Sequence, residues 1–485
     1  MADDKQDGET SGAITRRQLM AGGLGLATAS VALGAQPSAG EPSGAGEPGG
    51  KTDYDVIIIG AGFCGVTAAR ECRRAGYRTL LLEARNRVGG RTFTAKFDGQ
   101  VVEFGGSWVH WTQPYVWTEL RRFGLQLHES SGASAESDKI IVHTSKRDIV
   151  TLSNAKVGAD IEKAVDKYMG DARGLLPLPH DPFGSDSYKT LDGISSQQRL
   201  DSLKGVSPLY RDIVDAFQAA QGSNYNDQFA WLEMVRWYAL SGYTFDGESD
   251  ATGRFLINEG TSSLLNHILE EARPELKLAT PVRRVIQDAT GVSVETDSGT
   301  MYRGRALVST VPLNVLKDID WQPALSDAQL QASRETHAGI GPKVHVLLEG
   351  DYGNITCYAP GRNAINWMNT QDIGGGNTHL IGFGPDPEIL NVNDTQSVQS
   401  AVRLFIPEAK VLHCSGYEWA LDPYSKGNWC TLRPGQWSKY LRELQRVRGR
   451  VIFASADWAN GWRGFIDGAI EQGLVAGRQV RALFG

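Results

Sequence analysis

The sequence predicts an α/β fold in which a doubly wound, Rossmann-like domain is combined with a second domain. The β-branched run Val56–Ile59 is followed at once by a G-x-G-x-x-G motif, Gly60–Gly65, and by a helical stretch, Val66–Ala75. A second apolar run, Leu80–Leu82, ends on Glu83. A chain of 485 residues is too long for one core, so at least two domains are expected.

Each glycine of the motif has a physical reason. Gly60 permits the tight turn, Gly62 lets the backbone approach a pyrophosphate, and Gly65 lets helix and strand pack closely. The helix N-terminus then faces the anion. Glu83 lies 18 residues after Gly65, where a carboxylate accepts hydrogen bonds from both ribose hydroxyls and repels a 2′-phosphate. These residues predict a site for the ADP part of a dinucleotide, but they do not distinguish NAD from FAD.

The residues after this site resemble a known family. The run E-A-R-N-R-V-G-G-R-T, Glu83–Thr92, is similar to the E-A-R-x-R-x-G-G-R-T segment of the flavin amine oxidase (monoamine oxidase-like) family. Glu103–Trp108 resembles that family's loop under the isoalloxazine ring. Val451–Asp457 resembles its last strand, although Ser455 replaces the usual Gly and Asp457 the usual Glu. The resemblance covers nearly all of the chain from Asp53 and implies FAD.

The resemblance also implies how FAD is held. Arg85 and Arg91 are expected at the pyrophosphate, where a guanidinium fork suits phosphate oxygens. Val282 is expected to pair with the adenine, and Asp457 to reach a ribityl hydroxyl. The cysteine that binds flavin covalently in some members corresponds to Asn428, which implies non-covalent FAD. The predicted cofactor residues are Gly60, Gly62, Phe63, Cys64, Gly65, Glu83, Ala84, Arg85, Gly90, Arg91, Thr92, Gly106, Ser107, Trp108, Val282, Asp457 and Ile466.

Three catalytic residues are implied in the same way. Lys343 corresponds to a lysine that contacts flavin N5 through a water, and burial beside a flavin would lower its pKa. Trp429 and Phe465 correspond to the aromatic cage, whose ring faces attract an amine by dispersion and cation–π forces. The predicted walls of the substrate pocket are Trp108, Phe217, Gln221, Trp367, Trp429 and Phe465. His110 is interpreted as structural, because this chemistry needs no strong base.

The reaction that the resemblance implies is oxidation of an amine. A hydride passes from the amine α-carbon to flavin N5, and the resulting iminium is hydrolysed to a carbonyl compound and an amine. Gly106–Trp111 and Asn366–Trp367 resemble bacterial nicotine-catabolic amine oxidases, so we expect pseudooxynicotine as substrate, then nicotine, then an arylalkylamine such as tyramine. The electron acceptor is O₂ or a periplasmic carrier such as a cytochrome c. A flavin desaturase and a non-catalytic flavoprotein stay open as other classes.

Composition and the N-terminal sequence predict compartment and partners. Arg16 and Arg17 precede the weakly apolar run Leu19–Ala35, which predicts a twin-arginine (Tat) signal peptide over residues 1–35 and export to the periplasm through the Tat translocon. A cytoplasmic location is the alternative. Residues 36–52 are rich in Gly, Pro, Ser and Glu and predict a flexible linker. A net charge of −7 argues against nucleic acid, no other stretch suggests a membrane anchor, and a homodimer stays open.

The resemblance further implies two domains that interrupt one another along the chain. The FAD-binding domain is predicted over 53–111, 254–320 and 420–485. The inserted α+β substrate domain is predicted over 112–253, which has a helical pattern, and 321–419. A buried strand and turn at Ala306–Pro312 is expected to complete the first sheet. The five cysteines show neither disulfide nor metal-ligand spacing, so no metal site is predicted.

Overall fold

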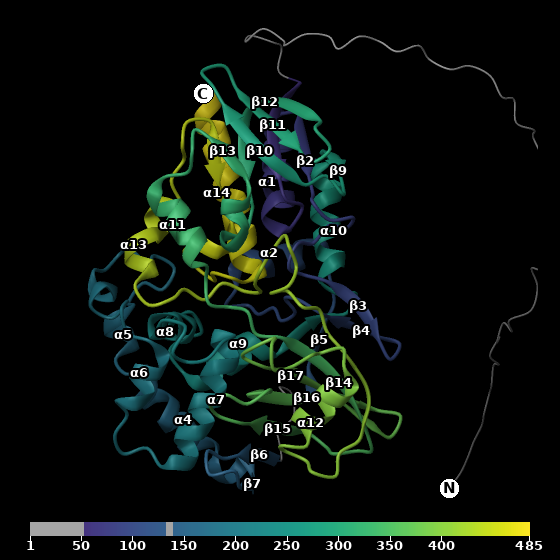
Figure 1. Cartoon of the computed structure of the whole chain (residues 1–485), viewed down its shortest axis with the longest axis vertical. Coiled ribbons are helices and arrows are strands. Elements are labelled where there is room, and N and C mark those ends of the chain that lie inside the picture. Colours follow the sequence, from purple (N-terminus) through teal and green to yellow (C-terminus); the bar gives the residue numbers. More distant parts are fainter. Residues whose placement is uncertain (1–52, 132–138) are drawn as a thin grey trace, which may run out of the picture. The chain divides into compact units, whose positions relative to one another are not determined.

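The computed structural model describes residues 53–131 and 139–485. The predicted signal peptide and linker lie outside the described residues. Lys51–Gly485 forms one compact unit built around two large sheets (Figure 1). Within the described residues, no helix combines the length and apolar character needed to cross a bilayer.

The first sheet has eight strands that come from three separate parts of the chain. Their order is β13 (Asp320–Gln322), β10 (Val282–Gln287), β11 (Val292–Thr296), β12 (Met301–Ser309), β1 (Tyr54–Ile59), β2 (Thr79–Leu82) and β9 (Glu275–Lys277), with β19 (Val451–Phe453) beside β12. Strands β9, β2, β1, β12 and β19 run parallel, whereas β10 and β11 join them as an antiparallel hairpin. Ala306–Pro312, the segment predicted to complete this sheet, overlaps the end of β12. It lies near the centre of the sheet, because β12 pairs with both β1 and β19.

Burial on both faces explains why the parallel strands are continuously apolar. Val56 and Ile58 of β1 pack on the side of α1 (Phe63–Arg74), α10 (Thr261–Ala272) and α14 (Ile466–Phe484), which lie side by side in Figure 1. Ile57 and Ile59 face the opposite core. That core also includes residues of the hairpin, and of α11 (Asp327–Glu335) and α13 (Gln436–Leu444).

The second sheet has seven strands. Their order is β18 (Val411–Ser415), β14 (Lys343–Glu349), β17 (Asn377–Phe383), β16 (Trp367–Gly374), β15 (Ile355–Tyr358), β6 (Lys139–His143) and β7 (Ile149–Leu152). Val344, Val346 and Leu348 of β14 pack in one core with α12 (Thr395–Val402). The alternate residues, beginning with Lys343, therefore face the other way.

The region 112–253 is largely helical, as its pattern indicated. Among its described residues, the helices are α2 (Pro114–Phe123), α4 (Asn154–Met169), α5 (Ala172–Leu175), α6 (Ser196–Asp201), α7 (Pro208–Gly222), α8 (Trp231–Leu240) and α9 (Phe245–Gly253). The helical interpretation was incomplete, because two strands from the same region extend the second sheet: β6 pairs with β15, and β7 pairs with β6.

The remaining elements are short. They are β3 (Thr94–Phe97), β4 (Gln100–Glu103), β5 (Leu127–Glu129), β8 (Phe255–Ile257) and the 3₁₀ turns η1 (Ser187–Thr190), η2 (Leu313–Asp318) and η3 (Ala456–Trp458). The predicted α/β fold with an added second sheet is confirmed. The domain boundaries stay a prediction, because Lys51–Gly485 is a single compact unit.

Candidate active site

A cavity of about 1080 Å³ is lined by residues of both sheets. This volume is slightly above the range of about 300–1,000 Å³ that is usual for a pocket that binds one small ligand. Every predicted site residue except Gly65 and Asp457 lines it. Predicted site residues that lie up to about 400 positions apart in the sequence therefore line one cavity.

The glycine motif forms the tight turn that was expected between β1 and α1. Gly60 has φ +99°, and a Cβ on Gly65 would lie 1.8 Å from the Gly60 carbonyl oxygen, so Gly65 is needed for packing behind the cavity wall. A Cβ on Gly62 would instead meet nothing closer than 3.7 Å. The space above Gly62 therefore belongs to the cavity, as a close-lying phosphate requires.

Glu83 directly follows β2, and its side chain is buried and lines the cavity. One carboxylate oxygen accepts the Ala61 N–H at 2.7 Å, and the other accepts the Arg85 N–H at 2.9 Å. These two bonds fix the carboxylate and leave a lone pair on each oxygen. Two neighbouring ribose hydroxyls would satisfy both.

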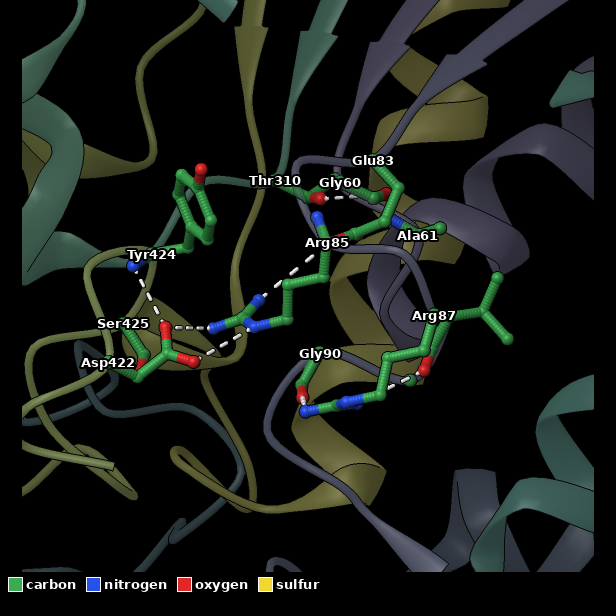
Figure 2. Close-up of polar contacts among 12 residues, drawn as sticks. Gly60, Ala61, Glu83, Arg85, Arg87, Gly90, Thr310, Asp422, Tyr424 and Ser425 are labelled. Carbon is green, nitrogen blue, oxygen red and sulfur yellow. Dashed lines mark hydrogen bonds and ion pairs between the residues drawn. The ribbon is translucent and has the colours of Figure 1, made fainter. Parts of the chain in front are cut away.

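Arg85 has a partner that the sequence did not suggest. Its guanidinium donates to both carboxylate oxygens of Asp422, at 3.1 Å from Nε and 2.5 Å from Nη2 (Figure 2). Asp422 also accepts the Tyr417 hydroxyl at 2.6 Å and the Tyr424 N–H at 2.8 Å. Burial alone would raise the pKa of Asp422, but the hydrogen bonds from Arg85 and Tyr417 lower it. The pair holds the segment around Asp422, including Tyr424, against the part of the cavity that Glu83 and Arg85 line.

Arg91 and Asp457 form a second long-range pair. Arg91 donates to the Asn428 carbonyl at 2.6 Å and to the Asp457 carboxylate at 2.5 Å. The other carboxylate oxygen of Asp457 accepts the Leu313 N–H at 2.8 Å. Asp457 is fully buried and does not line the cavity, so its role in this structure is to hold Arg91. The expected contact with a ribityl hydroxyl stays a prediction.

Lys343 begins β14 and is 4% exposed. Its Nζ donates to the Gly105 carbonyl at 3.0 Å and to Ser107 Oγ at 2.5 Å. Burial lowers the pKa of Lys343 to about 7, although the nearby Glu103 carboxylate raises it in part. A lysine in this state exchanges a proton near neutral pH, whereas an exposed lysine stays charged.

The register of the second sheet places aromatic rings beside Lys343. Lys343 pairs with Phe383, which pairs with Trp367, which pairs with Tyr358, so the four side chains share one face. All four line the cavity. The Phe383 ring centroid lies 5.8 Å from that of Trp429. Sequence reasoning missed Phe383 and Tyr358, because only the strand register brings them to the site.

The two predicted cage residues lie on neighbouring segments. Trp429 is oriented by its indole N–H, which donates to the Gln221 carbonyl at 2.9 Å. Phe465 packs edge-on against Trp237, with ring centroids 4.8 Å apart. Gly464 lets the segments touch, since a Cβ there would lie 2.9 Å from the Cys430 nitrogen. Both rings remain partly exposed to the cavity.

The position that corresponds to the family's flavin-bearing cysteine holds an amide. Asn428 donates to Ser223 Oγ at 2.5 Å and to the Gly341 carbonyl at 2.7 Å. Cys430 is buried outside the cavity lining, and its thiol donates to the Asp457 carbonyl. His110 bonds Asp250 at 2.9 Å and also lies outside the lining, in keeping with a structural interpretation.

Comparison with known proteins decides the family. Residues 63–481 match the family of flavin-containing amine oxidoreductases. The chain belongs to this family. It is 40% identical to pseudooxynicotine dehydrogenase of a Pseudomonas species, over 99% of this chain and 98% of that protein. It is 36% identical to nicotine dehydrogenase of Pseudomonas putida, over 98% of each chain. This family member is therefore an amine-acting oxidoreductase with a flavin cofactor.

Solved structures agree on the fold. A putrescine oxidase variant superimposes with a TM-score of 0.75 at 22% identity, covering 88% of this chain and 99% of that chain. Cyclohexylamine oxidase from Brevibacterium oxydans gives a TM-score of 0.72 at 19% identity, covering 89% and 99%. The family member thus has the monoamine oxidase-like fold.

Proposed function

We propose that this protein is an FAD-dependent amine oxidase and that its substrate is pseudooxynicotine or a related aromatic secondary amine. The observation that carries the proposal is that Lys343, Trp429 and Phe465 line the same cavity as the dinucleotide motif. The similarity to pseudooxynicotine dehydrogenase supports the choice of substrate. Nicotine is the second candidate, because the relative that is 36% identical is a nicotine dehydrogenase.

The residues present fit FAD as a non-covalent cofactor. Gly62 leaves open space for a pyrophosphate, and Glu83 retains lone pairs for a ribose. Asn428 cannot form the thioether that a cysteine at its position would form. Among the cysteines, Cys64 lines the cavity, and burial raises the pKa of its thiol, which keeps it protonated.

Bound FAD would supply the redox chemistry by accepting a hydride from the amine α-carbon. The protein orients the amine: Trp429 and Phe465 present two ring faces, and Phe383 closes the wall beside Trp429. These apolar walls exclude water and favour the neutral amine. Lys343 Nζ, held by Gly105 and Ser107, takes up or releases a proton near pH 7. The product iminium leaves to be hydrolysed to a carbonyl compound and an amine.

Anaerobic mixing with candidate amines tests the proposal. Pseudooxynicotine should bleach the visible absorbance of the oxidised flavin faster than nicotine, tyramine, spermidine or L-amino acids. Bleaching by dithionite but by no amine would instead favour a desaturase or a non-catalytic flavoprotein. Acid precipitation should release the flavin into the supernatant, and flavin that stays with the denatured chain would contradict non-covalent binding.

The electron acceptor is proposed to be a carrier protein such as a cytochrome c, with O₂ as the alternative. Two relatives bear the name dehydrogenase, whereas a relative that is 27% identical, from Paenarthrobacter nicotinovorans, is named (S)-6-hydroxynicotine oxidase. Stopped-flow reoxidation of the reduced enzyme by ferricytochrome c and by air-saturated buffer separates the two. Faster reoxidation by O₂, with one H₂O₂ formed per turnover, would argue for an oxidase.

Export to the periplasm through the Tat translocon is also proposed. The support is the sequence alone, Arg16-Arg17 followed by a weakly apolar run. Fractionation of cells that express the wild type and an Arg16→Lys, Arg17→Lys variant tests it. Equal amounts of both proteins in the cytoplasm would favour the cytoplasmic alternative.

A further inference from the structure

Phe465, one of the two cage residues, lies at the end of a largely buried segment that has no regular secondary structure. The segment comprises residues 459–465 and connects η3 to α14. Gly461, Trp462 and Arg463 in its middle are buried. The N–H and C=O groups of such a buried backbone need partners other than those of a helix or a sheet. The groups that provide these bonds therefore help to determine where the segment, and with it the Phe465 ring, lies.

Two charged side chains provide part of this bonding. Glu471 of α14 accepts the Asn460 N–H at 2.8 Å and the Gly461 N–H at 3.0 Å. From the other side, Arg236 of α8 donates to the Gly461 carbonyl and, at 3.4 Å, to the Arg463 carbonyl. A guanidinium suits this task because its planar fork carries several N–H donors in fixed directions. Arg236 thus connects α8 to two carbonyls of the segment that ends on Phe465.

Arg236 is itself held by a buried network of charges. Glu233, one turn earlier on α8, accepts Arg236 through one carboxylate oxygen at 3.2 Å and Arg463 through the other at 2.6 Å. All three side chains are fully buried. Charged groups at this depth are costly to leave unpaired, so the three side chains are confined to one arrangement.

The same helix contacts the cage ring directly. Trp237, the residue after Arg236, packs edge-on against Phe465, with ring centroids 4.8 Å apart. Trp462 packs against Phe465 as well, with ring centroids 4.9 Å apart. One of these two indoles belongs to α8, and the other belongs to the segment that Arg236 holds. A shift of the segment relative to α8 would therefore change the orientation of the Phe465 ring.

We propose that Arg236 is a positioning residue for amine oxidation, holding the 459–465 segment so that the Phe465 ring faces the bound amine. The inference rests on the proposed amine oxidase function. Among the described residues that line the cavity, none is Arg236, Glu233 or Arg463, so Arg236 acts through the segment and not on the substrate. Hydride transfer depends steeply on the orientation of the amine, and a misplacement of about 1 Å can cost about 100-fold in rate.

Arg236→Met tests the proposal in the holoenzyme. It does not leave an isolated buried charge, because Glu233 keeps Arg463 as its partner. Anaerobic stopped-flow reduction by pseudooxynicotine gives the limiting rate and the apparent Kd. The limiting rate should fall by about 10- to 100-fold and the apparent Kd should change by less than about threefold, since the ring is misplaced but present. Arg236→Lys should lie between Arg236→Met and the wild type, because an ammonium lacks the planar fork.

A double-mutant cycle distinguishes positioning from a general structural role. If Arg236 acts through the ring of Phe465, Arg236→Met should slow flavin reduction by less than about threefold in a Phe465→Leu background. A Lys343→Met background is the matched control. The full loss should remain there, because Lys343 belongs to the second sheet and bonds Gly105 and Ser107 instead.

The outcomes separate the inference from the function on which it rests. A wild-type limiting rate in Arg236→Met, or an undiminished loss in the Phe465→Leu background, would overturn the positioning role and leave the amine oxidase function intact. A wild-type flavin that dithionite reduces and no amine reduces would overturn both. If Arg236→Met does not accumulate with bound flavin, Arg236→Lys replaces it in the same cycle, and a wild-type rate or an undiminished loss in that variant would overturn the role equally.

Discussion

Replacing Glu248 with glutamine is expected to stabilise the protein at neutral pH. Glu248 lies on α9, is fully buried, and has no hydrogen-bond partner for either carboxylate oxygen among the described residues. Burial raises its pKa from 4.5 to about 8. The folded protein therefore keeps the proton at pH 7, whereas the unfolded chain has released it.

The sign and size of the effect follow from these two pKa values. An acid whose pKa is raised by folding contributes full stability below its unfolded pKa, and stability falls as the pH rises towards the folded pKa. Between pH 4.5 and pH 7 the unfolded state is stabilised relative to the folded state by about 1.4 kcal/mol per pH unit. The free energy of unfolding therefore falls by about 3 kcal/mol over this range. Glutamine has the same shape and no proton to release. The variant should therefore gain about 3 kcal/mol at pH 7 and less than about 1 kcal/mol at pH 4.5.

Urea unfolding followed by circular dichroism at several pH values between 4.5 and 8 measures this difference. Glu388→Gln, at an exposed position, is the matched control and should follow the wild type at every pH. The reasoning is refuted if Glu248→Gln differs from the wild type by a constant amount across this range. A variant less stable than the wild type at pH 7 would refute it as well.

Three further predictions concern the site. In the wild type, reoxidation of the reduced flavin should become faster as the pH rises through about 7 and Lys343 loses its proton. Lys343→Met should slow reoxidation and abolish this pH dependence. A stopped-flow pH profile that is unchanged in the variant would exclude this role. Gly65→Val should abolish flavin incorporation, because its Cβ would collide with the Gly60 carbonyl; a fully loaded variant by absorbance would contradict the packing argument. Asp422→Ala should speed dissociation of FAD by about tenfold or more, since Arg85 loses its buried partner. Flavin fluorescence after dilution measures this, and a wild-type rate would mean that the Arg85–Asp422 pair does not retain the cofactor.

Local patterns in the sequence were enough to predict the turn, the close packing and the carboxylate at the end of the cavity near Gly60. The turn at Gly60, the packing at Gly65 and the carboxylate of Glu83 each depend on residues within about 25 positions of one another, and the structure has them as expected. The β-branched run before them predicted β1 for the same reason.

The rest of the site depends on contacts that no local pattern encodes. Phe383 and Asn369 reach the cavity only because β14, β17 and β16 pair in one particular register, and a shift of one residue would turn them away. Asp422 and Asp457 find their arginine partners more than 300 residues away. The strands β6 and β7 were missed because β15, the strand through which β6 joins the sheet, lies about 200 residues later in the chain.

The two long-range ion pairs have a consequence for the order of events during synthesis. The cavity is lined by residues near Gly60 and also by residues as late as Ala469. Arg85 and Arg91 can form their ion pairs only after Asp422 and Asp457 have been synthesised. Folding that proceeds from the N-terminus on the ribosome can form β1, α1 and β2 early, but it cannot enclose a flavin. Until the last strand and helix emerge, two arginines that end up largely buried lack their acidic partners. Cofactor capture is therefore expected only after nearly the whole chain has been synthesised.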